Sequence, residues 1–329
     1  MSVIERLSSV SDTTLNRLIR GAIMVLAIGI PLLAALYFLD RGTDHGPTLI
    51  ERQIATAEDV VRKAPDQLGP RIALAQVYQA ARRPDSALEQ YDEVLKVSAL
   101  NKTALLGRGD ILLDKGDLVG AAKAFKKVAD TAAGGEFSGV DPQLEHAYYG
   151  LGSVALKQDR ARDAVSAFEH AVTIKSTDAD AWYLLGTAAL QAGDAEHAAG
   201  ALERAILFVP TGWCEPYDAL SQAYAKLGRG AKAEYAAAMV DFCKNRTSAA
   251  VSRLEGLTSG PAALEAMLGI GMIAETTNDR AAAVRAYRKV LAADPGNFNA
   301  LSGLSRLGAK PVAHPKSPSG GSSSNGATS

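Results

Sequence analysis

The sequence predicts an all-α protein in which a superhelical solenoid of helix-turn-helix repeats follows one transmembrane helix. Small and apolar residues recur every three or four positions through most of the 329-residue chain, which is the period of amphipathic helices. The same pair of helical patterns returns several times, separated each time by a short polar turn. Near the N-terminus an uncharged apolar run replaces this periodicity.

The clearest repeat is AWYLLGTAALQAGDAEHAAGALERAILFVP, from Ala181 to Pro210. Two amphipathic helices are separated by AGD, and we expect Gly186 and Ala198 to let them approach closely. Pro210 ends the second helix because proline lacks the N–H for the next backbone hydrogen bond. The periodic positions are Trp182, Leu185, Gly186 and Ala189, then Ala198, Leu202 and Ala205.

Five further segments repeat this pattern. The small residue that opens each second helix lies at Ala87, Ala121, Ala164, Ala198, Ala233 and Ala283. Four residues later the chain has Tyr91, Phe125, Phe168, Leu202, Ala237 and Tyr287. The pattern resembles the tetratricopeptide repeat, a helix-turn-helix unit of about 34 residues, over residues 67–297. Arg108 and Ser221 depart from the family's usual Leu and Gly, so we expect the second and fifth repeats to be looser.

The rest of the chain is divided by composition. Residues 67–308 are expected to form about six repeats and a C-terminal capping helix, with a loop at 132–142 and a short extra helix within 246–261. Residues 40–66 are expected to form a linker and an N-terminal capping helix, because an open solenoid must cover its ends. The tail, residues 309–329, is rich in Pro, Gly and Ser and is predicted to be disordered.

An uncharged run, GAIMVLAIGIPLLAALYFL, occupies residues 21–39. It is long enough to cross about 30 Å of hydrocarbon at 1.5 Å per residue. A cleaved signal peptide is the alternative, but no small-x-small site follows before Asp40 and Arg41. We therefore predict a single-pass protein of a bacterial cell membrane.

The orientation rests on a small difference in basic residues. Arg6, Arg17 and Arg20 precede the apolar run, and Arg41 and Arg52 follow it within a comparable distance. The positive-inside rule favours a short cytoplasmic segment at residues 1–20. The repeats are then extracytoplasmic.

Two cysteines, Cys214 and Cys243, lie at the two open ends of the helix pair of the fifth repeat. Those ends are neighbours in an antiparallel pair, so we predict a disulfide bond in an oxidising compartment. The alternative is two buried thiols in a cytosolic solenoid.

Charge and motif content exclude several function classes. The 35 Lys and Arg residues nearly balance 36 Asp and Glu residues, so no basic excess is present to bind nucleic acid. The five histidines are scattered without metal-ligand spacing, and the Gly-rich segments at 149–153 and 269–271 lie inside predicted helices rather than in phosphate loops. We expect no cofactor, no metal and no enzymatic activity.

The remaining hypothesis is binding of a protein or peptide partner in the concave groove that the first helices would line. The inward positions of the family's pattern give an apolar and acidic surface, with partner-binding candidates Leu106, Asp110, Tyr149, Asp180, Tyr183, Glu215 and Asp218. The plan of the chain resembles anchored repeat proteins of bacterial envelope assembly, including c-type cytochrome maturation. That resemblance implies a membrane-anchored scaffold. The alternative is a permanent structural subunit of a membrane protein complex.

Overall fold

The computed structural model describes residues 12–42 and 47–311, and every regular element in them is helical. The chain divides into two compact units, Met1–Pro65 and Asp66–Ser329, which are described separately. From residue 312 onward the predicted disordered tail lies outside the described residues, as do residues 1–11.

The N-terminal unit contains helices α2 (Asp12–Gly42) and α3 (Leu49–Lys63). Within α2, Ile19–Tyr37 has a mean hydropathy of 2.2 and is not buried inside the protein. By length and composition this helix fits a membrane span, and a signal sequence has the same character. Helix α3 begins with a capping box in which Thr48 and Glu51 satisfy each other's backbone N–H groups. Its predicted role as a cap of the solenoid stays a prediction.

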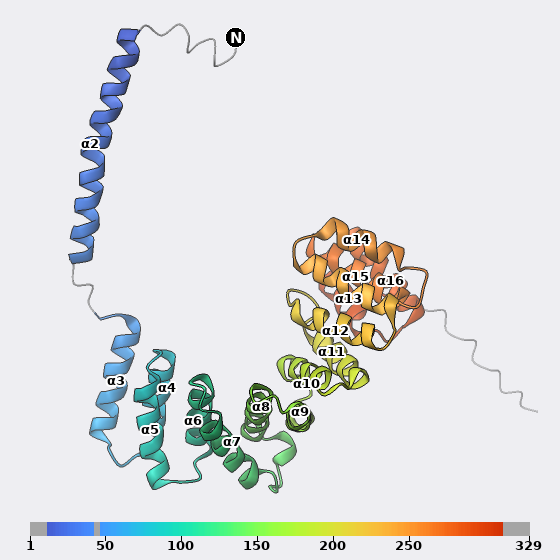
Figure 1. Cartoon of the computed structure of the whole chain (residues 1–329), viewed down its shortest axis with the longest axis horizontal. Helices are drawn as coiled ribbons and strands as arrows, with labels where there is room; N and C mark the ends of the chain where they lie inside the picture. The colour runs from blue at the N-terminus through green and yellow to red at the C-terminus, as the bar shows by residue number, and fades with distance from the viewer. Residues whose placement is uncertain (1–11, 43–46, 312–329) are drawn as a thin grey trace, which may run out of the picture. The chain divides into compact units, whose positions relative to one another are not determined.

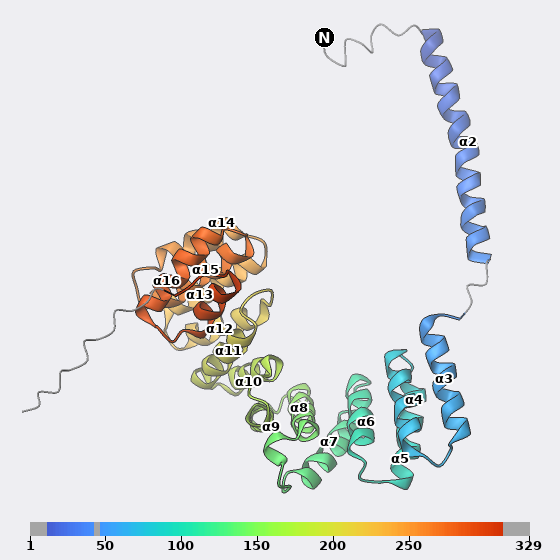
Figure 2. The same cartoon turned by 180° about the vertical axis from the view of Figure 1, so that it is seen from behind.

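The second unit consists of successive antiparallel helix hairpins (Figures 1 and 2). The helices are α4 (Leu68–Ala80), α5 (Pro84–Val97), α6 (Lys102–Asp114), α7 (Leu118–Ala132), α8 (Pro142–Lys157), α9 (Ala161–Ile174), α10 (Ala179–Ala192), α11 (Ala195–Phe208), α12 (Glu215–Lys226), α13 (Gly230–Cys243), α14 (Thr247–Gly256), α15 (Ala263–Thr276), α16 (Arg280–Ala293) and α17 (Phe298–Arg306). A short 3-10 helix, η1 (Ser138–Val140), lies in the expected loop between α7 and α8. Helix α14 is the short extra helix predicted within 246–261.

Each hairpin turn is specified locally. Between α10 and α11, Gly193 has φ 85°, a left-handed conformation that costs glycine little. The next residue, Asp194, accepts a hydrogen bond from the N–H of His197 at 3.0 Å and so caps α11. The sequence AGD therefore ends one helix and starts the next within three residues.

In the core, large side chains on the second helices pack directly against glycines of neighbouring helices. The Phe125 side chain on α7 is fully buried, and it lies between Gly109 on α6 and Gly150 on α8. A Cβ added at those glycines would come within 2.7 Å and 2.6 Å of the ring. Phe168 lies against Gly152 in the same way, and Leu202 lies against Gly186. The close helix approach predicted from small residues is confirmed.

The fifth hairpin departs from this scheme. Five of the predicted small residues are fully buried, namely Ala87, Ala121, Ala164, Ala198 and Ala283, whereas Ala233 is only half-buried. Ala237 is half-buried too, and the buried residues of α13 are larger ones such as Tyr235 and Met239. The register predicted for α13 was therefore wrong, because Tyr235 fills the core in place of the expected Ala237.

The packing order changes at the same place. The first helices α4, α6, α8, α10 and α12 pack successively against one another, and then it is α13 that packs on α15 and α15 on α17. An extra helix, α14, lies between α13 and α15 in the chain and contacts both. Insertion of a single helix shifts which helix of each pair continues the series.

Candidate functional site: an acidic cavity on the first helices

One cavity, where α10, α12 and the end of α13 meet, is lined by three of the seven predicted partner-binding residues. It has a volume of about 510 Å³. Of the predicted binding residues, Tyr183, Glu215 and Asp218 line it. The other lining residues are Thr187, Leu190, Gln191, Cys214, Ala219, Gln222, Val240 and Lys244.

One aromatic ring that lines this site, Tyr183, packs against a second ring from the neighbouring connection. The ring of Tyr183 meets the ring of Trp213 edge to face, with centroids 5.0 Å apart, an arrangement that such pairs favour. Tyr183 is half-buried and is held on α10, where its carbonyl also accepts a hydrogen bond from the Thr187 hydroxyl at 2.9 Å. Trp213 lies in the α11–α12 connection, outside the helical period, and sequence reasoning missed it.

Two carboxylates also line the cavity. Glu215 and Asp218 lie in the first turn of α12, where the helix dipole favours negative charge. Both are exposed, and Asp218 accepts a hydrogen bond from the Gln222 amide at 3.0 Å. In the described part of the chain neither carboxylate has an ion pair. Lys244, at the end of α13, brings a positive charge to the same cavity.

The remaining predicted residues lie elsewhere. On α8, Tyr149 is half-buried and meets Phe168 edge to face at 5.8 Å. Burial raises the pKa of Tyr149, and the negative charge of Asp180 adds to that rise. These two residues form a second acidic stretch on α8 and α10.

On α6, Leu106 is 5% exposed and belongs to the core, so little of its side chain is offered to a partner. Asp110 contacts His146 on α8, with the Asp110 Oδ1 and His146 Nε2 atoms 2.9 Å apart. This contact raises the pKa of His146, while burial acts in the opposite direction. Asp110 is thus engaged within the protein.

Cys214 and Cys243 are neighbours, as their positions in the hairpin predicted. Burial raises the pKa of Cys243 to about 12, and a hydrogen bond with the Cys214 side chain contributes. Both are free thiols in the structure, so the predicted disulfide bond is not present in it. Cys214 itself lines the acidic cavity.

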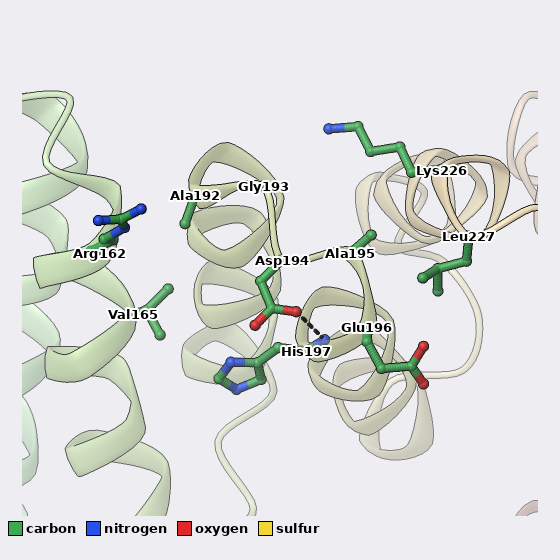
Figure 3. A pocket seen from close by; sticks show the side chains of 10 residues that line it. All are labelled: Arg162, Val165, Ala192, Gly193, Asp194, Ala195, Glu196, His197, Lys226 and Leu227. Atoms are coloured by element: carbon green, nitrogen blue, oxygen red, sulfur yellow. Dashed lines mark hydrogen bonds between the residues drawn. The ribbon is translucent and has the colours of Figure 1, made fainter.

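A larger hollow of about 720 Å³ opens between α9, the α10–α11 turn and the end of α12 (Figure 3). The acidic side chains that line this hollow already have partners within the protein. Asp194 caps α11 through the N–H of His197, drawn as the dashed line in Figure 3, and Glu196 pairs with Arg229 at 2.9 Å. None of the predicted partner-binding residues lines it. Among residues 12–42 and 47–311, no group of three or more potential ligands is placed to hold a metal ion.

The sequence matches a family model. The model is that of the tetratricopeptide repeat (TPR), and it matches residues 72–136, 147–211 and 244–298, more than half of the chain. This chain belongs to the tetratricopeptide repeat family. It is accordingly a scaffold of the protein-binding type, and the predicted all-α TPR solenoid is confirmed. The unmatched residues between the second and third segments contain α12 and α13, the hairpin whose register departs from the others.

Several solved TPR structures are similar to this chain. YrrB, described as a TPR protein with an unusual peptide-binding site, is 20% identical; the match covers 60% of this chain and 97% of YrrB, with a TM-score of 0.49. MamA from Desulfovibrio magneticus RS-1, from residue 41 to its end, is 22% identical over 55% of this chain and 97% of that one, with a TM-score of 0.48.

The C-terminal part of a TPR repeat-containing protein from Cytophaga hutchinsonii is 19% identical. That match covers 78% of this chain and 96% of the other, with a TM-score of 0.48. The comparison with curated proteins gave no match.

Proposed function

We propose that this TPR protein holds an extended segment of a partner protein in the cavity between α10 and α12, and that the segment carries Lys or Arg. The observation that carries the proposal is that one cavity is lined by Tyr183, whose ring packs on Trp213, and by the two carboxylates of Glu215 and Asp218. Aromatic anchors often dominate the free energy of binding. Carboxylates without ion pairs favour a cationic partner, chiefly through association rate and specificity.

The test is photo-crosslinking of the full-length protein in its native membranes, with a photoreactive amino acid at Gln222, followed by identification of the crosslinked peptide. The expected peptide contains Lys or Arg. Its affinity should fall about tenfold with Tyr183→Ala, which corresponds to about 1.4 kcal/mol. Asp218→Asn should slow association and reduce its salt dependence.

The matched control is Tyr148→Ala. Tyr148 lies on α8 and is also half-buried, but its ring stacks on His170 at 4.6 Å and lines a different hollow. The Tyr148→Ala substitution should leave the affinity for the peptide unchanged. Equal losses for Tyr148→Ala and Tyr183→Ala, or a crosslinked peptide rich in Asp and Glu, would refute the proposal.

Anchoring by α2 belongs to the same proposal. We infer that residues 21–39 span a bacterial cell membrane with the repeats on the extracytoplasmic side. The helix is apolar and unburied there, and three arginines precede this run whereas two follow it within a comparable distance. A partner would then be held close to the membrane surface. The narrower role in envelope assembly, such as c-type cytochrome maturation, and the absence of enzymatic activity stay predictions.

The disulfide bond between Cys214 and Cys243 is proposed for the protein in that compartment. Its support is the direct contact of the two thiols. Oxidation would tie the α11–α12 connection, which carries Trp213, to the end of α13. The chain segment beside the cavity would lose freedom in the unbound state, which lowers the entropic cost of binding.

The alternative function is that of a permanent structural subunit of a membrane protein complex. In that case the α10–α12 cavity would be occupied in every purified complex. Size-exclusion chromatography with light scattering on protein from native membranes distinguishes the two. A permanent subunit should elute at the mass of a stable complex, whereas the scaffold should be recovered free and still bind the crosslinked peptide.

A further inference from the structure

A second carboxylate site lies on the N-terminal turn of α8. Glu145 is only 8% exposed, and in the described part of the chain its carboxylate has neither a hydrogen bond nor an ion pair. Its oxygens still reach solvent, since no fully buried side-chain oxygen there lacks a hydrogen-bond partner. Burial raises the pKa of Glu145, and the negative charge of Asp178 raises it further. A carboxylate with so little access to water is stabilised by a cation that reaches it from outside.

The neighbouring cations are already engaged by other carboxylates. Lys175 donates to Asp178 at 2.6 Å, and His146 contacts Asp110 at 2.9 Å. The charges of Lys175 and His146 still lower the pKa of Glu145, but by less than burial and Asp178 raise it. The protein therefore lacks a free local cation to neutralise Glu145.

The surroundings of Glu145 lie on the same face as the predicted groove residues. Tyr149 follows one helical turn later, and residues four apart on a helix are neighbours on its surface. The charges of Asp180, Asp178 and Glu145 all raise the pKa of Tyr149, so the three carboxylates act electrostatically on this one ring. Asp180 is exposed at the start of α10, and α8 and α10 pack against each other.

We propose that Glu145, with Tyr149 and Asp180, forms a subsite that binds a Lys or Arg side chain of the partner segment. This inference rests on the proposed function and specifies it, because one extended segment can pass from the α10–α12 cavity to this subsite. A cation would complete the hydrogen bonding of the buried carboxylate, and charge-assisted hydrogen bonds are about twice as strong as neutral ones. Glu145 is then a specificity-determining residue that the sequence pattern did not single out.

The test uses two end-blocked, fluorescent 12-residue peptides with a Ser and Ala background. One carries Lys at every third position, and the other carries norleucine there. Fluorescence anisotropy with the full-length protein measures both affinities. Glu145→Gln should weaken the Lys peptide about tenfold, the effect of one charge-assisted hydrogen bond, and should leave the norleucine peptide unchanged. The control Glu255→Gln, at an exposed position on α14, should change neither affinity by more than about twofold, as expected of a screened surface charge.

Thermal unfolding gives a second readout that needs no ligand. Since Gln removes a buried charge without changing the shape of the side chain, Glu145→Gln should raise the unfolding midpoint of the free protein at pH 7. A lower midpoint would mean that the carboxylate has a partner within the protein, and it would overturn the subsite.

The two proposals fail in distinguishable ways. Loss of Lys-peptide affinity with Tyr183→Ala but not with Glu145→Gln would overturn the subsite and leave the cavity proposal standing. The reverse pattern would support the subsite and overturn the cavity. A wild-type protein that binds the Lys peptide no more tightly than the norleucine peptide would overturn both.

Discussion

Replacement of Gly150 by alanine should destabilise the solenoid, although alanine is the better helix former. Gly150 lies within α8, and its added Cβ would come within 2.6 Å of the Phe125 ring, which is fully buried. The ring is confined on its other side by Gly109, where an added Cβ would also be too close, at 2.7 Å. Phe125 therefore has no direction in which to move away without displacing α6.

The expected size follows from two opposing effects. Gly to Ala in a helix interior gains about 0.5–1 kcal/mol from backbone entropy, whereas overpacking of a close-packed core costs about 1–3 kcal/mol. Because two helices and a ring would have to move, the upper part of that range applies. We expect a net destabilisation of about 1–2 kcal/mol.

The assay is urea unfolding of Gly150→Ala, followed by circular dichroism, with Gly200→Ala as the matched control. Gly200 lies inside α11, and an added Cβ there would meet no atom within 4 Å. The control should gain about 0.5–1 kcal/mol, so the two substitutions should act in opposite directions.

A double variant tests the cause. Phe125→Leu should reduce the additional cost of Gly150→Ala, since a smaller side chain leaves room for the new methyl group. The reasoning would be refuted by a Gly150→Ala protein as stable as wild type, or by equal costs of that substitution with Phe and with Leu at position 125.

Three further predictions concern charge, redox state and topology. The pKa of His146 is raised by Asp110, so their contact should stabilise the fold fully below the ordinary His pKa of about 6.5 and lose that effect as the pH rises through the raised value. Asp110→Asn should therefore cost more stability at pH 5.5 than at pH 9, by less than about 1 kcal/mol because the side chains are 42% and 37% exposed and solvent screens their contact; an equal cost at both values would contradict this. Mass spectrometry of non-reduced peptides from the native membrane should find Cys214 joined to Cys243, with a stabilisation of about 3–4 kcal/mol for a loop of that length; two freely alkylated thiols would exclude the bond. If residues 21–39 span the membrane as proposed, a C-terminal reporter active only outside the cytoplasm should function, and activity of a cytoplasmic reporter instead would reverse the topology.

The fold was predictable because glycine and alanine at helical spacing mark the positions where two helices approach closely. Where a repeat has Gly186 opposite Leu202, or Gly109 opposite Phe125, the residue types indicate both the close helix approach and the large side chain that packs at it. The same reasoning failed at α13. There the sequence offers alanine at many consecutive positions, and only the packing of Tyr235 and Met239 selects the buried face.

The site was less predictable than the fold. The sequence could select Tyr183, Glu215 and Asp218, which line one cavity, because the first helices keep a constant register; their role in binding stays a prediction. Trp213 was missed because it lies in a connection where no helical period applies. Glu145 was missed because its importance comes from the pairing of Lys175 with Asp178, a tertiary fact that spacing along α8 does not contain.

The change of packing order at α13 limits the length of anything that binds along the first helices. From α4 to α12 five helices follow one another, and with about 8–10 Å between neighbouring axes the track measures about 32–40 Å. An extended chain advances about 3.3 Å per residue, so roughly 10 to 12 residues fill it. Beyond α12 the series continues through α13 and α15, and the α10–α12 cavity lies where this change occurs. A partner would therefore be read as a short linear motif of fixed maximum length, with one terminus of the motif in the cavity, rather than as an indefinitely extended strand.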